Sequence, residues 1–399
     1  MPVSGERRTI VVVGAGIGGL TAALALAGVG YRVVIVERAD RLSAIGAGIQ
    51  IGPNASGILA RYGLDKALAA AATEPEAIEV RSGVSGNLLV AVPGSAFRER
   101  YGFPYRVIHR ADLQDILARA VIAEPAIELS LGATPVEIVE QDDGLRVSIR
   151  RPPGTETVTA AAVVAADGVW STLRSRIAGS ARPVPAGRTA WRAVVDAAAI
   201  SGLPLNRVGL WLGRDAHIVH YPVAAGASVN IVAIVPETWS AETWSALGDR
   251  AELLAKFSGW PDPARKLLAT PPSWQKFAMF TVDPSGPWSD GRIALLGDAA
   301  HAMAPFLAQG AAMAIEDAAV LALRLRGATD IPAALLAYEA ARKLRVMRVA
   351  EASARTGAQY HAAGPIAFAR DLALRAAGVR LILDRADWIY RYQAPDAGY

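Results

Sequence analysis

The 399-residue sequence contains no cysteine and only five histidines. The absence of cysteine excludes disulfides, thiolate nucleophiles and cysteine-ligated metal sites together. The histidines stand at positions 109, 217, 220, 301 and 361 and form no H-E-x-x-H pair, so we predict no metal centre. A stable fold must therefore come from core packing. With 52% hydrophobic residues, a chain of this length can bury a large core, and we expect two intimately packed domains.

Two other features are also missing. No uninterrupted apolar stretch is long enough to suggest a membrane span. The net charge is +4, but Lys and Arg are dispersed, and no basic run is interleaved with aromatic residues. We therefore expect neither membrane insertion nor nucleic-acid binding, and we predict a cytoplasmic protein that is a monomer or a homodimer.

The sequence does contain a glycine-rich segment near its start, VVVGAGIGGLTAALALAGVGYRVVIVER, residues 11–38. Glycines interrupt its apolar run and a second strand pattern follows at once, which argues against a secretory signal. The segment instead predicts a strand, a tight turn with the spacing G-x-G-x-x-G, a helix and a second strand. This is half of a dinucleotide-binding unit.

Each glycine of the turn has a structural role. Gly14 permits the turn, Gly16 lets backbone amides approach a pyrophosphate, and Gly19, or Gly18 in a shifted register, lets the helix pack on the strand. The helix N-terminus offers unpaired N–H groups to the phosphates. Glu37 ends the second strand and can accept hydrogen bonds from both ribose hydroxyls, so a 2′-phosphate would be repelled there. The motif predicts an ADP-containing ligand, but alone it does not distinguish FAD from NAD.

Four consecutive strand candidates, separated by Gly- or Ala-containing turns, indicate a mostly antiparallel sheet in the middle of the chain. They are TAWRAVVDA (189–197), RVGLWLG (207–213), AHIVHYPV (216–223) and SVNIVAIV (228–235). Elsewhere the patterns predict helices over 53–63 and 111–120, strands within 76–92 and 135–150, a buried parallel strand at 161–168, and C-terminal helices to about residue 382.

Because the dinucleotide-binding pieces lie at both ends of this sheet region, we expect discontinuous domains. We predict an α/β fold with a Rossmann-like FAD-binding domain, an inserted, mostly antiparallel β-sheet substrate domain and C-terminal helices. The expected ranges are 1–75, 105–180 and 275–330 for the first domain, 76–104 and 181–274 for the second, and 331–399 for the helical region.

The choice of FAD depends on a second segment, GRIALLGDAAHAMAPFLAQGAAMAIEDAA, residues 291–319. An apolar strand leads to Asp298 in a loop, Pro305 stiffens that loop, and Gly310 opens a helix whose free amides offer a second anion site. A carboxylate at position 298 would repel a pyrophosphate, so its natural partner is a hydroxyl donor such as a polyol chain. FAD has a ribityl chain and NAD has none. The second set of amides can meet the flavin N1–C2=O edge, which becomes anionic on reduction.

Taken in order, three motifs resemble the class A flavoprotein aromatic hydroxylases. They are Gly14 to Gly19 with Glu37-Arg38, then Ala166-Asp167-Gly168 with Ser171 and Arg174, then Gly297-Asp298-Ala-Ala-His301 through Pro305 and Gly310. Within that family, GAGIQIGPNA (46–55), IHRADL (108–113), AQGAAMAIEDA (308–318) and DWIYRY (387–392) are most similar to the salicylate, 3-hydroxybenzoate and 6-hydroxynicotinate hydroxylases. The resemblance implies one FAD, NADH or NADPH as reductant, and O₂ as co-substrate. It also implies hydroxylation of an anionic phenolic or hydroxypyridine carboxylate substrate through a flavin C4a-hydroperoxide.

The resemblance also assigns roles to single residues around the flavin. It implies that Glu37 and Arg38 meet the adenosine ribose, Arg110 reaches the phosphate or ribityl region, and Asp298 holds the ribityl chain. Gly310 and Ala311 would present amides to the pyrimidine edge, and Pro305 would lie where the flavin C4a meets oxygen. Gly48 and Asp167 are further cofactor-binding candidates. The alternatives are a helix-flanking surface charge for Arg110 and a purely structural turn for Asp167.

Substrate chemistry is expected from the segment RDAHIVHYPV, residues 214–223. In a strand, His217, Val219 and Tyr221 share one face and His220 lies on the other, so the two histidines do not form a metal pair. His217, with a pKa near the operating pH, is a candidate to take a phenolic proton, and Tyr221 to hydrogen-bond a carboxylate or hydroxyl. The alternative for His217 is an ordinary sheet histidine.

Two more candidates for the substrate site come from departures within the family. Gln50 stands where some relatives carry a histidine, and Phe306 where at least one branch has a polar residue, so the ring substitution pattern of the substrate is open. His301 is expected to shape the flavin loop rather than to move protons. The competing functions are an NAD-dependent dehydrogenase or reductase that uses the first Rossmann unit alone and a flavin-binding protein without turnover.

Overall fold

A six-stranded sheet in the order β18-β19-β11-β1-β2-β7 forms one half of the fold. A computed structural model describes residues 7–42, 48–239 and 243–394. Five of the strands are parallel and β18 pairs antiparallel at the edge. The central strands are buried runs of Val, Ile and Ala, as a parallel sheet covered on both faces requires. The bounds are β1 Thr9–Val13, β2 Arg32–Glu37, β7 Ile127–Leu131, β11 Ala162–Ala165, β18 Ser289–Asp290 and β19 Ile293–Leu295.

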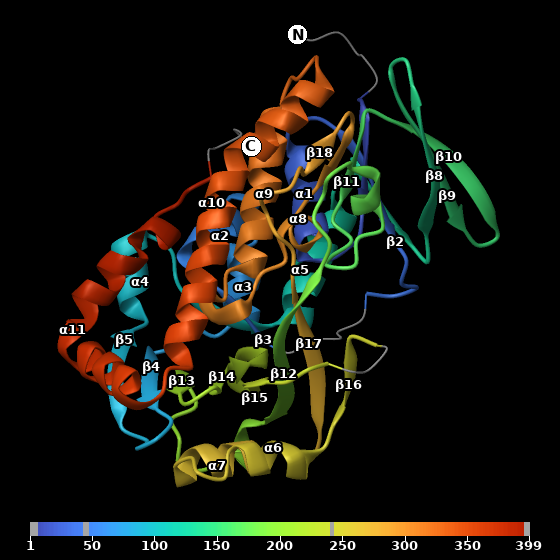
Figure 1. Ribbon diagram of the computed structural model, residues 1–399. Helices are drawn as coiled ribbons and strands as arrows, with labels where there is room; N and C mark the ends of the chain where they lie inside the picture. The colour runs from blue at the N-terminus through green and yellow to red at the C-terminus, as the bar shows by residue number, and fades with distance from the viewer. Residues whose placement is uncertain (1–6, 43–47, 240–242, 395–399) are drawn as a thin grey trace.

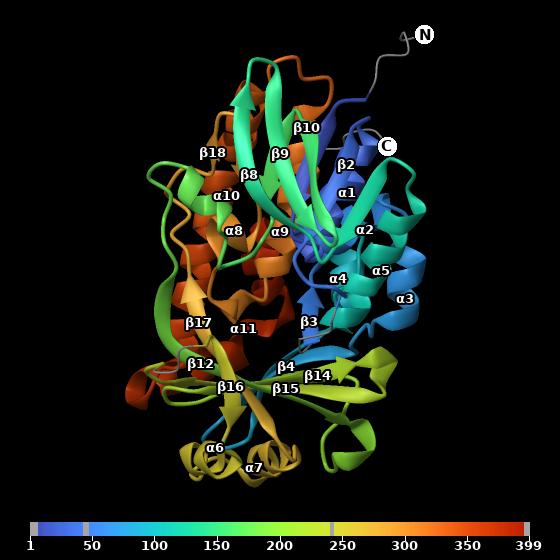
Figure 2. The same cartoon turned by 90° about the vertical axis from the view of Figure 1, so that its right-hand side faces the viewer.

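Helices and two small sheets complete this half. α1 contacts both α5 and α9, and α2 packs against α9. The three-stranded antiparallel sheet β10-β9-β8 stands at the top of Figure 2, and β3 pairs with β6 in a separate two-stranded sheet. The bounds are α1 Ile17–Gly28, α2 Pro53–Arg61, α3 Asp65–Ala71, α5 Arg110–Ala123, α8 Asp298–His301, α9 Gly310–Leu325, β3 Gly48–Ile51, β6 Arg106–His109, β8 Thr134–Gln141, β9 Gly144–Arg151 and β10 Gly154–Ala160.

The other half is an eight-stranded sheet in the order β16-β17-β12-β15-β14-β13-β4-β5, in which only the β13–β4 pair is parallel. α6 and α7 cover its far face (Figure 2), where they bury Trp191, Ile218 and Ile231. The bounds are β4 Ala77–Ser82, β5 Leu88–Pro93, β12 Val184–Asp196, β13 Val208–Leu212, β14 His217–Val223, β15 Ser228–Pro236, β16 Ser245–Gly248, β17 Trp274–Thr281, α4 Ser95–Tyr101, α6 Arg250–Lys256 and α7 Asp262–Ala269.

Two long C-terminal helices join the halves (Figure 1). α10, Ile331–Tyr360, packs on α9 and β18, and its C-cap residue His361 contacts His217 of β14. α11, Gly364–Tyr390, packs against β5 and α2. Within the described residues, none of the helices combines the length and the apolar character needed to cross a bilayer.

The predicted fold class is confirmed: an α/β half of Rossmann type carries an inserted, mostly antiparallel sheet and C-terminal helices. Two elements extend further than the sequence suggested. The eight-stranded sheet includes β17, which runs to Thr281 because its residues pair with both β12 and β16, while the predicted domain limits stay predictions. The last helix was expected to stop near residue 382, but it runs to Tyr390 because its final turns pack around α4 through Tyr101 and Asp387.

Candidate active site

One cavity of about 570 Å³ lies between the two halves and receives residues from both. Its upper wall is formed by the turn after β1, the end of β2 and the N-termini of α8 and α9. Its floor is formed by β12, β14 and β15 of the eight-stranded sheet. Segments from both ends of the chain therefore meet at one place.

The turn after β1 depends on its glycines. Gly14 has φ +103°, and a Cβ there would lie 2.5 Å from the carbonyl oxygen of Ala166. A Cβ on Gly19 would lie 1.9 Å from the Gly14 oxygen, and one on Gly18 would meet Leu296. Gly16, by contrast, has nothing within 4 Å of such an atom. Gly14, Gly16 and Gly18 line the cavity, whereas Gly19 serves only the close packing of α1 on the turn.

The N-termini of α1 and α9 face the cavity and carry free amides. α1 begins after Gly16 and α9 after Gln309, and neither N-cap makes a side-chain capping hydrogen bond. Neither helix has an acidic residue in its first turn, so the positive end of each dipole is uncompensated. Gly310 and Ala311 line the cavity, and a Cβ on Gly310 would meet nothing within 4 Å. These are two anion sites on one wall.

A buried ion network holds the second of these helices against the Asp298 turn. His301 Nε2 lies 2.6 Å from Asp317 Oδ2, which also accepts from the Gly297 N–H at 3.1 Å. Arg342 Nε donates to the other Asp317 oxygen at 2.7 Å. Burial alone would raise the pKa of Asp317, but His301 and Arg342 lower it. The structure thus buries His301 against Asp317 of α9. It also begins α8 at Asp298, where the sequence suggested a loop.

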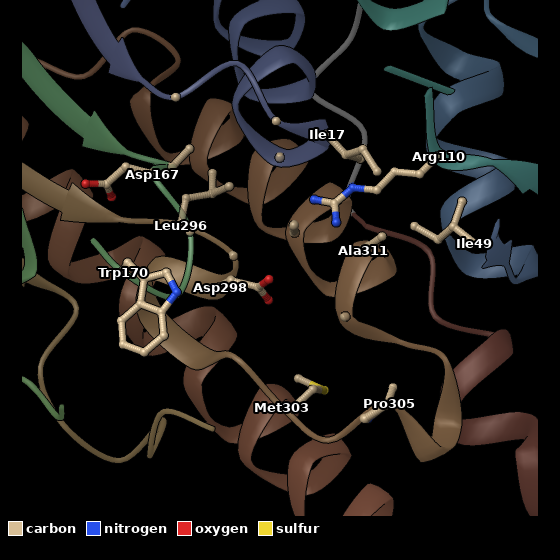
Figure 3. Close-up of a pocket in the computed structure, with 18 of the residues that line it drawn as sticks. Ile17, Ile49, Arg110, Asp167, Trp170, Leu296, Asp298, Met303, Pro305 and Ala311 are labelled. Atoms are coloured by element: carbon tan, nitrogen blue, oxygen red, sulfur yellow. The ribbon is translucent and has the colours of Figure 1, made fainter. Parts of the chain in front are cut away.

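The charged side chains of the cavity come from separate elements. Arg110 and Asp298 both project into it (Figure 3). Glu37 accepts from the amides of Ala15 and Ala39 at 2.8 and 2.9 Å, which fixes its carboxylate at the cavity wall beside Arg38. One Asp167 oxygen accepts from the amide of Thr172 at 2.9 Å, while the other is buried without a hydrogen-bond partner.

This donor set fits FAD. The free amides of α1 suit a diphosphate, Glu37 offers acceptors to ribose hydroxyls, and Asp298 offers acceptors to a polyol chain. Gly16 and Gly310 leave their backbone open on the cavity side, so a ligand can approach both N-termini closely. The orphaned oxygen of Asp167 leaves an acceptor for a ligand at the same wall.

The floor of the cavity follows from cross-strand register. Tyr221 pairs with Asn230 and His217 with Ile234, and between them Val219 pairs with Val232. One strand further, Val232 pairs with Arg192. Because alternate residues of a strand share a face, an apolar patch of Val219, Val232 and Ile234 lies among three polar side chains, His217, Tyr221 and Arg192, all lining the cavity.

The His217 ring is held by a second histidine. Its Nδ1 lies 2.8 Å from Nε2 of His361, the C-cap residue that follows α10. Burial, His361 and Arg188 lower the pKa of His217 well below its ordinary value, so the expectation of a pKa near the operating pH is wrong. Burial likewise lowers the pKa of His361 to about 4. With both rings neutral, one proton lies between them, and an Nδ1–H tautomer of His217 leaves Nε2 as an acceptor.

The other substrate-site candidates, Gln50, Tyr221 and Phe306, differ in whether they line the cavity. Tyr221 is hydrogen-bonded to Gln50, which also accepts from Tyr105 at 2.5 Å, and burial raises the Tyr221 pKa. Gln50 and Tyr221 line the cavity, as does Gly48, where a Cβ would lie 2.3 Å from the Tyr221 ring. Phe306 is not among the cavity-lining residues of the described chain. Its ring packs edge-on to His217, with centroids 5.6 Å apart, because the 3₁₀ turn Pro305–Leu307, of which it is part, directs it toward Gly357 of α10.

Some residues escaped the sequence reasoning. Arg192 lies in the strand segment TAWRAVVDA, but only cross-strand register places it beside Val232 and in the cavity. His361 is 144 residues from His217, and nothing in its local sequence distinguishes it. Trp170 and Met303 also line the cavity. Gly46 and Ala47 of the motif at 46–55 lie outside the described residues.

Comparisons with known proteins indicate the same cofactor. Residues 7–353 match the model of a family described as FAD binding domain. The chain is 35% identical over 388 residues to 3-hydroxybenzoate 6-hydroxylase of Polaromonas naphthalenivorans (strain CJ2), covering 96% of this chain and 95% of that one. It is 39% identical over 403 residues to a 3-amino-4-hydroxybenzoate 2-monooxygenase of Streptomyces platensis, with 99% of both covered. A salicylate hydroxylase solved as a substrate complex superposes with a TM-score of 0.81 at 28% identity, covering 97% and 96% of the chains.

Proposed function

This chain belongs to the class A flavoprotein aromatic hydroxylases, and from that premise we propose that it hydroxylates an aromatic acid carrying a ring hydroxyl, with NADH or NADPH as reductant. One observation carries the proposal: His217 and Tyr221 stand on an apolar floor directly below the wall that fits FAD, within one cavity. The relatives named above act on hydroxybenzoates, which supports the same substrate class. A cytoplasmic location and a monomeric or homodimeric state remain predictions.

FAD, when bound, supplies the electron transfer from the nicotinamide and the activation of O₂, and the protein supplies position and proton transfer. We expect the amides of α1 and Arg110 to hold the diphosphate, Glu37 and Arg38 the adenosine ribose, and Asp298 the ribityl chain. Gly310 and Ala311 are expected to donate to the pyrimidine edge. Pro305 is expected to close the oxygen side, and Asp167 to contact the dinucleotide.

On the floor, His217 Nε2 is expected to accept the proton of the ring hydroxyl, which makes the ring electron-rich for attack on an electrophilic oxygen. The low pKa of His217 does not prevent this. Burial penalises an isolated imidazolium, but the phenolate formed beside it would compensate that charge. Tyr221, held by Gln50, is expected to hydrogen-bond the ring substituents, and Phe306 to support the His217 ring from behind.

The test is a substrate screen on the purified protein. Bound FAD should give a blue-absorbing flavin spectrum. Members of a panel of hydroxybenzoates, hydroxypyridines and indoles should stimulate NADH oxidation and yield a product whose mass shows one added oxygen, with or without loss of CO₂. A colourless protein that oxidises or reduces substrate with NAD alone would instead indicate a dehydrogenase. Flavin without any substrate-stimulated NADH oxidation would indicate a non-catalytic flavoprotein.

A further inference from the structure

A proton taken from the ring hydroxyl by His217 must still leave the cavity. His217 is 2% exposed and lies on the floor, which the flavin and the substrate would cover. The rings of Phe306 and Tyr360 flank its imidazole, with centroids 5.6 and 5.5 Å away, and burial raises the pKa of Tyr360 to about 12. Within the described residues, the side chain of His217 hydrogen-bonds only to His361. His361 is therefore the one polar exit from the buried ring.

The two imidazoles form a pair that begins in the cavity and ends outside it. Nδ1 of His217 lies 2.8 Å from Nε2 of His361, and the ring centroids are 5.0 Å apart. His361 is 7% exposed and is not among the described residues that line the cavity. Its Nδ1 makes no hydrogen bond to a described residue, yet it is not one of the fully buried nitrogens left without a partner. The inner ring thus opens to the cavity and the outer ring opens to solvent.

Contacts from three elements fix the two rings against each other. The carbonyl of His361 accepts from the amide of Asp215 at 3.2 Å, in the turn that leads into β14. The carbonyl of Asp215 accepts in turn from Arg188 Nη1 of β12 at 2.8 Å. Phe306 packs edge-on to both imidazoles, with centroids 5.6 Å from His217 and 5.5 Å from His361. Its ring shields the contact between them from water, and the short fixed distance suits direct proton transfer.

The charges around the outer ring favour release of a proton over its retention. Burial, followed by Arg188, lowers the pKa of His361 to about 4, and Arg370 of α11 acts in the same direction. Asp215 opposes them, but its side chain is exposed to solvent. An imidazolium formed at His361 would therefore give its proton readily to water at neutral pH.

We propose that His361 carries the substrate's proton from His217 to solvent. The inference rests on the proposed function, which places the ring hydroxyl at His217 Nε2. In the transfer, the substrate O–H bond breaks and an Nε2–H bond forms on His217, while the Nδ1–H bond of His217 breaks and an Nε2–H bond forms on His361. The proton on His361 Nδ1 then leaves to water, and the phenolate stays in the cavity. The reverse passage returns one proton when the product leaves, which restores both tautomers.

Proton release on ligand binding tests the proposal without turnover. The FAD-loaded enzyme is mixed rapidly, without NADH, with 3-hydroxybenzoate, 4-hydroxybenzoate or salicylate in weak buffer, and a pH indicator follows the proton. The pH is about 7.5, where a free phenol with a pKa of about 10 is protonated. At least one ligand should bind the parent enzyme with release of a proton. His361→Gln should bind it about as tightly but release the proton about 10-fold more slowly or slower still, because an amide accepts a hydrogen bond from His217 without taking up its proton.

His361→Ala separates proton transfer from the positioning of the His217 ring. The space left by the imidazole should admit small solutes, because the parent Nδ1 is open to solvent. The compound 4-methylimidazole can exchange a proton at both nitrogens, whereas its isomer 1-methylimidazole can do so at only one. Only 4-methylimidazole should restore the rate of proton release. Equal rescue by both isomers would show that His361 merely positions His217, and absence of rescue by 4-methylimidazole would also overturn the proposal.

His220→Gln is the matched control, because His220 is a buried histidine of the same strand that is not among the described residues lining the cavity. It should release the proton at the parental rate, and the unfolding midpoint checks that every variant is folded. Parental release by His361→Gln, or no release from the parent enzyme with any of the three ligands, would refute the proposal.

The fate of the proposed function is read separately. A parent enzyme that releases the proton through His361 but hydroxylates no member of the panel would retain this inference and refute the hydroxylase activity. An enzyme that hydroxylates its substrate while His361→Gln releases the proton at the parental rate would do the reverse.

Discussion

The two walls of the cavity are built in different ways. The upper wall holds its ligand mainly through backbone: the turn from Gly14 to Gly19 and the open amides of α1 and α9. The floor holds its ligand through side chains that come from three strands and are supported by α10. A binding site made of backbone tolerates a substitution only where the added side-chain atoms meet no neighbour. A binding site made of side chains changes its chemistry with each substitution. We therefore expect the upper wall to determine the cofactor and the floor to determine the substrate.

The largest effect is expected on the floor. His217→Ala should lower hydroxylation by about 10² to 10⁴, the usual range for loss of a general base, with FAD binding and NADH oxidation largely intact. The uncoupled oxygen should appear as hydrogen peroxide. Raising the pH should partly restore hydroxylation of the more acidic phenols, because solution then supplies the phenolate. Product and peroxide are measured together.

His361→Gln sharpens that experiment, since the amide can keep a hydrogen bond to His217 while the second imidazole is removed. It should reduce hydroxylation less than His217→Ala does. Parental hydroxylation by His217→Ala, without extra peroxide, would return His217 to an ordinary sheet histidine.

A single added methyl group should disrupt the turn from Gly14 to Gly19. Gly19→Ala places a Cβ 1.9 Å from the Gly14 oxygen and should destabilise the protein by about 3 kcal/mol, with loss of FAD. Gly16→Ala is the matched control, because its Cβ meets no protein atom within 4 Å. It should fold normally and lose only FAD affinity. Urea unfolding and FAD titration separate the two effects, and equal stability losses in both variants would contradict the comparison.

The carboxylate acceptors of the upper wall, Glu37 and Asp298, should have a smaller effect on FAD binding than the glycine turn. Glu37→Ala removes the carboxylate expected at the ribose and should weaken FAD binding by about 1.5 to 3 kcal/mol. Asp298→Ala should act in the same direction through the ribityl chain. Both are measured as FAD retention on dilution. Unchanged retention in both variants would mean that the dinucleotide lies elsewhere.

The smallest effect is a pH dependence of stability that belongs to the eight-stranded sheet. Burial lowers the pKa of His220 to about 4, below the ordinary 6.5. Between these values the unfolded chain binds more protons, so stability is fully present above about pH 6.5 and is lost as the pH falls toward 4. The loss at pH 5 should be of the order of 1 to 2 kcal/mol. It should shrink in His220→Asn, as judged by urea unfolding at pH 7.5 and 5, and an unchanged pH dependence would exclude this histidine as its source.

What the sequence could predict also differs between the upper wall and the floor of the cavity. The strand, turn and helix at residues 9–28 could be predicted because each glycine acts on neighbours a few residues away. The face of β14 that carries His217 and Tyr221 was likewise predictable from the two-residue period. The cavity-facing position of Arg192 was not, because the same period assigns its face but not the strands beside it. The placement of the Phe306 ring edge-on against His217 was not predictable either, because it depends on the 3₁₀ turn Pro305–Leu307, and its role at the substrate stays a prediction.

By itself, then, the sequence determined the cofactor cradle, the two kinds of sheet and the polar residues of one strand. These depend on local spacing and on the alternation of side chains. Only the tertiary structure decided that His361 meets His217, that Arg192 lies unpaired in the cavity, and that the pKa of His217 is low. Pairing of distant strands, packing of α10 and removal of water from a side chain are properties of the whole fold, and no short segment carries them.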